Sequence, residues 1–125
     1  MYAFVEPNTS GDLLKYEADQ LYSRERATLT AGPALRLGTV LGCVTASGVF
    51  APLAPAAKDG TQIAAAVLLF DCQASASNRP HAIILARHAI VAHHAVVWPD
   101  GITAEQQHNA IVQLRAQGIL VRQGV

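Results

Sequence analysis

A chain of 125 residues in which nine basic residues balance nine acidic ones has the size of one domain and no net charge. Because the basic residues are scattered, no positive patch is expected to bind nucleic acid or an anionic membrane, and no apolar stretch is long enough to span a bilayer. Charged residues make up 14% of the sequence, against about 25% in a typical soluble protein, which favours burial of surface against partner proteins.

The first 22 residues predict an extended N-terminal arm. Turn-forming residues occupy positions 7–12, and the large apolar side chains are too sparse to form a core, although they are suitable for contact with a partner: Tyr2, Phe4, Val5, Leu13 and Leu14. We therefore divide the chain into an arm, residues 1–22, and a domain, residues 23–125. The N-terminus lacks the basic start and apolar core of a secretion signal, so we expect an unprocessed, cytosolic protein.

Short strands are predicted for the first half of the domain. Residues 27–45 are rich in β-branched side chains and are interrupted by glycines, which indicate bulges or bends. A further extended piece begins at residues 49–50, but Pro52 and Pro55 remove backbone donors, so residues 51–57 are expected to be a loop or a sheet edge. Residues 58–60 then form a turn.

The apolar run at residues 64–70 has the length of a strand and predicts a central strand that is covered on both faces. Residues 81–86 and 89–98 predict two more strands, and residues 99–101 a turn. Thr103 and Gln106 have the spacing of a capping box, which predicts a helix that ends near Gly118. Ile111 and Leu114 share one face of this helix, while three other side chains are expected to meet solvent: Glu105, Gln113 and Arg115.

Residues 119–122 close the chain as a short strand. The predicted class is α+β: a small, β-rich domain with one C-terminal helix and an extended N-terminal arm.

Four of the five histidines lie between positions 81 and 94 and suggest a metal or ligand site. On an ideal strand His88 and His94 point to the same face but lie about 20 Å apart, and His93 points to the other face. No carboxylate or thiol lies at a supporting spacing within this stretch, so ligands would have to come from neighbouring strands. We expect no metal and no cofactor. The alternative is a small oligomeric β-domain that binds a metal or small ligand through His81, His88, His93 and His94.

Cys43 and Cys72 have no CxxC spacing, which predicts two buried free thiols rather than a metal ribbon or a disulfide framework. Trp98 ends a predicted strand, where a large ring favours a place in the core or in a contact between subunits over a ligand pocket. The sequence contains no Gly-x-Ser-x-Gly elbow, Walker loop or dinucleotide fingerprint. We therefore do not expect an enzyme.

Several short blocks in a fixed order resemble the head decoration proteins of lambda-type bacteriophages. They extend over most of the chain: Ser23-Arg24-Glu25, Ala27-Thr28-Leu29, Gly38-Thr39-Val40-Leu41-Gly42, Asp59-Gly60-Thr61, Ala64-Ala65-Ala66-Val67-Leu68-Leu69, Val97-Trp98-Pro99 and Gly118-Ile119-Leu120-Val121-Arg122. The resemblance implies a β-tulip-like protomer that assembles as a homotrimer at threefold and quasi-threefold sites on the exterior of the expanded head. It also implies that the partner is the major capsid protein, that the arm becomes ordered on the shell, and that binding stabilises the head against internal DNA pressure. Such a protein is made in the host bacterial cytoplasm and ends in the virion.

Overall fold

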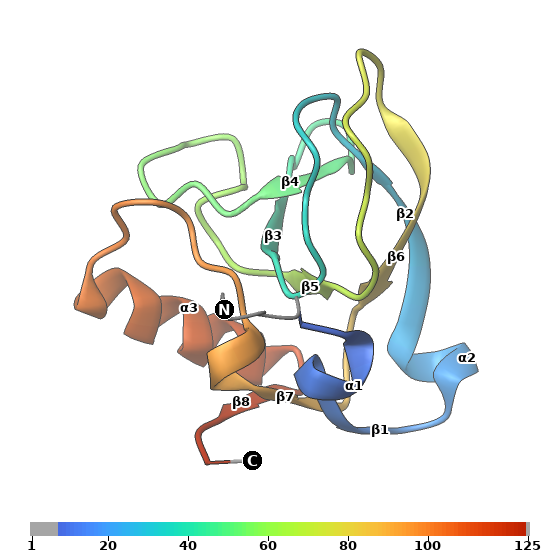
Figure 1. Ribbon diagram of the computed structural model, residues 1–125. Helices are drawn as coiled ribbons and strands as arrows, with labels where there is room; N and C mark the ends of the chain where they lie inside the picture. The colour runs from blue at the N-terminus through green and yellow to red at the C-terminus, as the bar shows by residue number, and fades with distance from the viewer. Residues whose placement is uncertain (1–7, 125) are drawn as a thin grey trace, which may run out of the picture.

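In the computed structural model, which describes residues 8–124, five strands close into a small barrel above a separate three-stranded sheet (Figure 1). Around the barrel the strands follow the order β2 (Arg24–Leu29), β4 (Phe50–Pro52), β3 (Val40–Cys43), β5 (Ala66–Leu68) and β6 (Arg79–Leu85). The sheet has the order β1 (Leu14–Glu17), β7 (Ala89–Ala92) and β8 (Ile119–Arg122). Helix α3 (Ala104–Ala116) lies beside this sheet. The predicted β-rich domain with a C-terminal helix is confirmed.

Barrel strands alternate between two hydrophobic cores because successive side chains of a strand point to opposite faces. Ala66 and Leu68 of β5 pack inside the barrel with Leu41 and Ile84, whereas Val67 packs into a second core between the barrel, the sheet and α3. All three residues of β5 are buried. The run at residues 64–70 is apolar for this reason, and the predicted central strand is confirmed in a shorter form.

Helix α3 begins with the predicted capping box. The Gln106 amide N–H donates to Thr103 Oγ1 at 3.1 Å, and the Thr103 N–H donates to Gln106 Oε1 at 3.0 Å. Leu114 is buried, but its partner on the buried face is Ala110, while Ile111 is only half-buried. Glu105 and Arg115 are exposed as predicted, but Gln113 is half-buried and its Oε1 accepts the Ala64 N–H at 2.8 Å, so Gln113 meets solvent only in part.

Two strand boundaries differ from the sequence prediction. The strand expected over residues 89–98 ends at Ala92, and a 3-10 turn, η1 (His93–Ala95), follows it. β4 pairs on one side with β3 and on the other with β2 at Leu29, so residues 51–52 are neither loop nor sheet edge, whereas residues 53–57 lie outside the strands as predicted. Pro52 is tolerated because it is the last residue of that strand.

The described part of the predicted arm is folded onto the domain. Residues 8–23 contain α1 (Ser10–Leu13), β1 and α2 (Gln20–Ser23), and β1 pairs antiparallel with β7. Residues 8–22, which were predicted to be part of an extended arm, therefore form two short helices and a paired strand. Among residues 8–124, no helix is long and apolar enough to cross a bilayer.

Candidate functional site

The N-terminal segment joins the domain through a buried leucine. Leu13, the last residue of α1, is 0% exposed and belongs to the core between the barrel and the sheet. Leu14 is half-buried, packs against the same core and lies opposite Val91 of β7. Both were predicted as capsid-binding residues, and the structure places them in the domain. The other three predicted binding residues, Tyr2, Phe4 and Val5, lie outside the described residues.

The carboxylate of Asp12 caps the N-terminal end of α1. The Thr9 N–H donates to Asp12 Oδ2 at 2.7 Å, and Thr9 Oγ1 donates to the same oxygen at 3.1 Å. These bonds to the charged form lower the pKa of Asp12, the backbone bond most strongly. The chain thus enters the domain at residue 9 through a defined turn.

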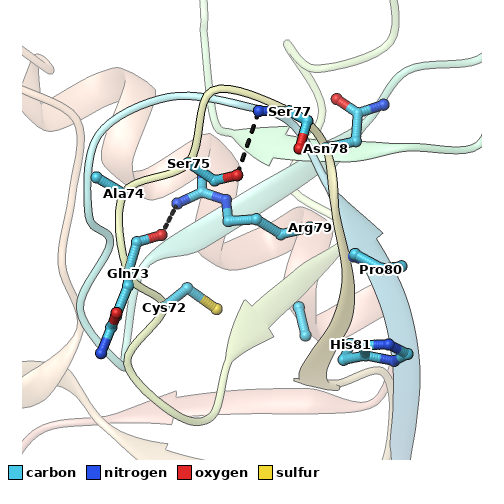
Figure 2. Close-up of a pocket in the computed structure, with 10 residues that line it drawn as sticks. Cys72, Gln73, Ala74, Ser75, Ser77, Asn78, Arg79, Pro80 and His81 are labelled. Carbon is cyan, nitrogen blue, oxygen red and sulfur yellow. Dashed lines mark hydrogen bonds between the residues drawn. The ribbon is translucent and has the colours of Figure 1, made fainter.

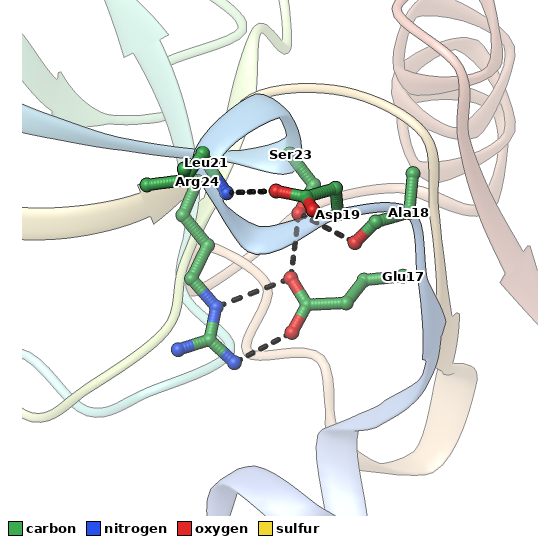
Figure 3. Close-up of polar contacts among 6 residues, drawn as sticks. All are labelled: Glu17, Ala18, Asp19, Leu21, Ser23 and Arg24. Atoms are coloured by element: carbon green, nitrogen blue, oxygen red, sulfur yellow. Dashed lines mark hydrogen bonds and ion pairs between the residues drawn. The ribbon is translucent and has the colours of Figure 1, made fainter.

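A bidentate ion pair joins β1 to the first barrel strand (Figure 3). Arg24 donates from Nε to Glu17 Oε2 at 3.1 Å and from Nη2 to Glu17 Oε1 at 2.6 Å. The hydroxyl of Ser23, which is fully buried, donates to Glu17 Oε2 at 2.6 Å. The Glu17 side chain is 11% exposed, so this pair is shielded from solvent and fixes the segment to the barrel. In the sequence, residues 23–26 are a charge cluster that could be solvated or could hold the arm by salt bridges, but nothing there identifies Glu17 as the partner, because only the turn through α2 brings positions 17 and 24 together.

The hydrogen bond from Arg24, followed by that from Ser23, holds the pKa of Glu17 below its ordinary value of 4.5. A carboxylate with a depressed folded-state pKa stabilises the fold above its unfolded-state pKa, and this contribution is lost as the pH falls through the folded-state value. We expect Glu17→Gln to lower the free energy of unfolding by about 1–3 kcal/mol at pH 7, and the difference from wild type to shrink below about pH 4.5. Urea unfolding at pH 7 and pH 3 measures this. The control is Glu105→Gln, which removes an exposed carboxylate; equal losses at both pH values for Glu17→Gln would contradict the assignment.

Three large side chains of β1 and α2 are exposed to solvent. Leu21 is 96% exposed, Tyr16 59% and Tyr22 47%. The Tyr22 ring lies 5.3 Å from the Arg87 guanidinium carbon and makes an edge contact with His88 at 4.9 Å between ring centres. Arg87 also donates to the Tyr22 carbonyl and to Glu25. These contacts hold the C-terminal end of α2, while Leu21 stays exposed to solvent.

The histidines of the alternative function do not converge. His81 lies on β6, His88 in the turn between β6 and β7 with a φ of 50°, and His93 and His94 in η1. Within residues 8–124 no three or more His, Cys, Asp or Glu side chains are placed to hold a metal ion. Because residues 93–95 form a 3-10 turn, the strand geometry assumed for His93 and His94 does not apply.

Trp98 lies at the margin of the second core. It is half-buried and packs against that core, at 6.2 Å between ring centres from His93. Its indole Nε1 is buried and has no hydrogen-bond partner among the described residues. The ring also lines a hollow of about 240 Å³ with Arg36, Pro52 and Asp100.

Arg79 ties together two loops at the far end of the barrel (Figure 2). Its guanidinium donates to three backbone carbonyls, those of Thr30, Pro33 and Gln73, at 2.6–3.0 Å. The residues around it line an open hollow of about 450 Å³ that includes Cys72 and His81. No sequence pattern marks Arg79, since its partners are backbone atoms 46–49 positions away or in the adjoining loop.

Cys43 and Cys72 are both free and half-buried, so the predicted full burial is wrong. Burial raises the pKa of the Cys72 thiol. The Cys72 thiol donates to the Phe70 carbonyl at 3.9 Å, and the Cys43 thiol donates to the Val44 carbonyl at 3.8 Å.

Comparison with protein families gives a match over nearly the whole chain. The model of the family described as bacteriophage lambda head decoration protein D matches residues 3–119. A comparison with curated proteins gives no match. The family match includes α1, β1, the barrel, α3 and the first residue of β8.

Proposed function

The chain belongs to the bacteriophage lambda head decoration protein D family, and from this membership we propose that it binds the outside of a phage head as a homotrimer. The family is one of structural capsid decoration proteins and not of enzymes, so the role is structural. The trimer occupies threefold and quasi-threefold sites of the expanded head, contacts the major capsid protein and stabilises the shell against internal DNA pressure. The match over residues 3–119 is the observation that carries this proposal.

The shell-binding element is the N-terminal arm. Tyr2, Phe4 and Val5 supply apolar side chains, and an extended segment that adds to a strand of the shell gains affinity from its main chain and specificity from such anchors. Three arms of one trimer act together, and multivalency of this kind raises avidity by roughly 10²- to 10⁴-fold.

The fold of residues 8–24 supports a protein in which the arm binds the shell and the domain holds the arm. Leu13 is embedded in the core, β1 is paired with β7, and Glu17 is locked to Arg24 and Ser23. A force applied to the arm therefore passes into the body of the domain instead of unravelling a loose linker. This anchoring suits a protein that holds a shell together under pressure.

The test compares wild type with the variant Tyr2→Ser/Phe4→Ser/Val5→Ser, mixed with expanded heads that lack the protein. We expect the variant to lose binding by at least roughly 100-fold, because three arms lose their anchors together. Co-sedimentation measures occupancy, and light scattering measures the oligomeric state, which should be a trimer for both proteins. The control is Ile63→Ser, which removes an apolar side chain that is 50% exposed at a site remote in sequence from the arm.

Two results would count against the proposal. Unchanged binding by the triple variant would transfer the shell contact from the arm to the domain. A monomeric wild type, or a wild type that ignores expanded heads, would contradict the decoration role itself.

A further inference from the structure

Two turns of the chain contain an aspartate followed directly by a glycine. Asp59-Gly60 lies between β4 and β5, and Asp100-Gly101 lies between η1 and α3. In such a pair the amide nitrogen of the glycine can attack the side-chain carboxyl group of the aspartate, because glycine has no side chain to hinder the approach. The reaction requires that both groups move freely. The contacts of each turn therefore decide whether its pair reacts.

Both reacting groups of Asp59-Gly60 are held by hydrogen bonds. Asp59 Oδ1 accepts the Thr61 hydroxyl and, at 3.0 Å, the Thr61 N–H, and these bonds lower the pKa of Asp59, the hydroxyl most strongly. The Gly60 N–H donates to Gln62 Oε1 at 2.8 Å. A Cβ at Gly60 would lie 2.3 Å from the Cys43 carbonyl oxygen, so this turn is also packed against β3. The pair is fixed, and its carboxyl group is kept in the charged form, which is a poor target for a nucleophile.

Neither reacting group of Asp100-Gly101 is held in this way. Both residues are exposed, and within residues 8–124 Asp100 takes part in no ion pair and the Gly101 N–H in no backbone hydrogen bond. No atom lies within 4 Å of the position of a Cβ at Gly101. The turn is closed by a long hydrogen bond, from the Ile102 N–H to the Pro99 carbonyl at 3.3 Å. This turn can therefore change conformation at little cost.

From this contrast we propose that Asp100 is a site of spontaneous isomerisation to isoaspartate, and that the fold protects Asp59 from the same reaction. The Gly101 nitrogen forms a bond to Asp100 Cγ, a C–O bond of the carboxyl group breaks, and the amide proton leaves with the hydroxyl group as water. The resulting five-membered imide takes up water at the main-chain carbonyl carbon of Asp100. The C–N bond at that carbon breaks, and the nitrogen, still bound to Cγ, regains a proton. Water is lost and then regained, so the mass of the protein is unchanged.

The product carries the main chain through the side chain of residue 100, which adds a carbon atom to the turn between Trp98 and Ile102. Both of these side chains pack against the second core, and Thr103, the next residue, caps α3. A longer turn disturbs this packing, so the isomerised protein is less stable. Under the proposed function the protein stays in the particle after assembly, and the product then accumulates as the particle ages.

The first experiment follows both pairs in the isolated full-length protein, kept for weeks at neutral pH. Trypsin separates them, because Asp59 falls in the peptide of residues 59–87 and Asp100 in that of residues 88–115. Isoaspartate leaves the mass of a peptide unchanged but alters its chromatographic retention. We expect the isomer to form at Asp100 at least roughly 10-fold faster than at Asp59, where hydrogen bonds to both reacting groups must first break. The variant Asp100→Glu, which keeps the charge but would need a larger ring, should form no isomer at residue 100.

The second experiment repeats the measurement on protein unfolded in urea, where the two pairs lose their tertiary contacts and should react at similar rates. Equal rates in the folded protein, or no isomer at Asp100, would overturn the proposal, and the same preference for Asp100 in urea would overturn its structural cause. Aged wild type should melt at a lower temperature than fresh protein, whereas aged Asp100→Glu should not. An unchanged melting temperature of isomerised protein would overturn the effect on packing. None of these results depends on binding to a head, so they leave the decoration role to its own test.

Discussion

Replacing Leu13 by alanine is expected to lower the free energy of unfolding by about 2–5 kcal/mol, the range found when a fully buried leucine is truncated in a core. Leu13 is 0% exposed, and α1 packs against β7 and η1. Leu13 Cδ1 lies 3.6 Å from the position that a Cβ would take at Gly38, so the truncation leaves a cavity beside Gly38. The loss would show that residues 8–14 belong to the folded domain.

Urea or thermal unfolding of the two proteins measures the difference. The matched control is Leu21→Ala, in the same segment but 96% exposed, which should change stability by less than about 0.5 kcal/mol. Equal, small effects of both substitutions would mean that the segment does not contribute to the core, and would restore residue 22 as the end of the arm. A large effect of Leu13→Ala alone moves the start of the domain to residue 8 or 9.

The elements that could be predicted from sequence are those whose cause is local. The capping box of α3 is formed within residues 103–106. The turn that ends the helix depends on Gly118, which has a φ of 82°. The apolar run at residues 64–70 was also informative, because a strand between two cores must be apolar on both faces.

The elements that could not be predicted depend on distant partners. Nothing near Leu13 in the sequence indicates that it packs against β7 and η1, about 80 residues later. β4 survives two nearby prolines because it gains neighbours on both sides from β2 and β3. His93 and His94 are in a turn because the chain must leave the sheet there to reach Trp98 and α3.

The candidate site divides in the same way. The apolar side chains among the first five residues are the basis for the proposed arm, whereas the Glu17–Arg24 pair follows from tertiary structure alone. Composition indicated that surface would be buried against partners, but it gave no location for the contact.

Glycines inside the predicted strands indicated bends, and Gly38 gives the reason in atomic terms. It has a φ of 90°, and a Cβ there would lie 2.3 Å from the Ala95 carbonyl oxygen and 3.6 Å from Leu13 Cδ1. The Gly38 N–H donates to the Leu68 carbonyl at 2.7 Å, and its own carbonyl accepts the Val97 N–H at 2.9 Å. These bonds fix the backbone of Gly38 between β5 and the chain after η1. The backbone at residue 38 and at Ala95 therefore cannot shift to make room for an added methyl group.

We expect Gly38→Ala to lower the free energy of unfolding by about 2–5 kcal/mol, the sum of the cost of a positive φ and the cost of overpacking against backbone. Gly48→Ala separates the two causes, because Gly48 has a φ of 74° but no atom within 4 Å of the position of an added Cβ. That control should lose only about 1–2 kcal/mol. Chemical denaturation of both variants gives the comparison. If they lost the same amount, backbone conformation alone would explain Gly38, and the contact of residue 38 with Ala95 would not limit the packing of η1 against the barrel.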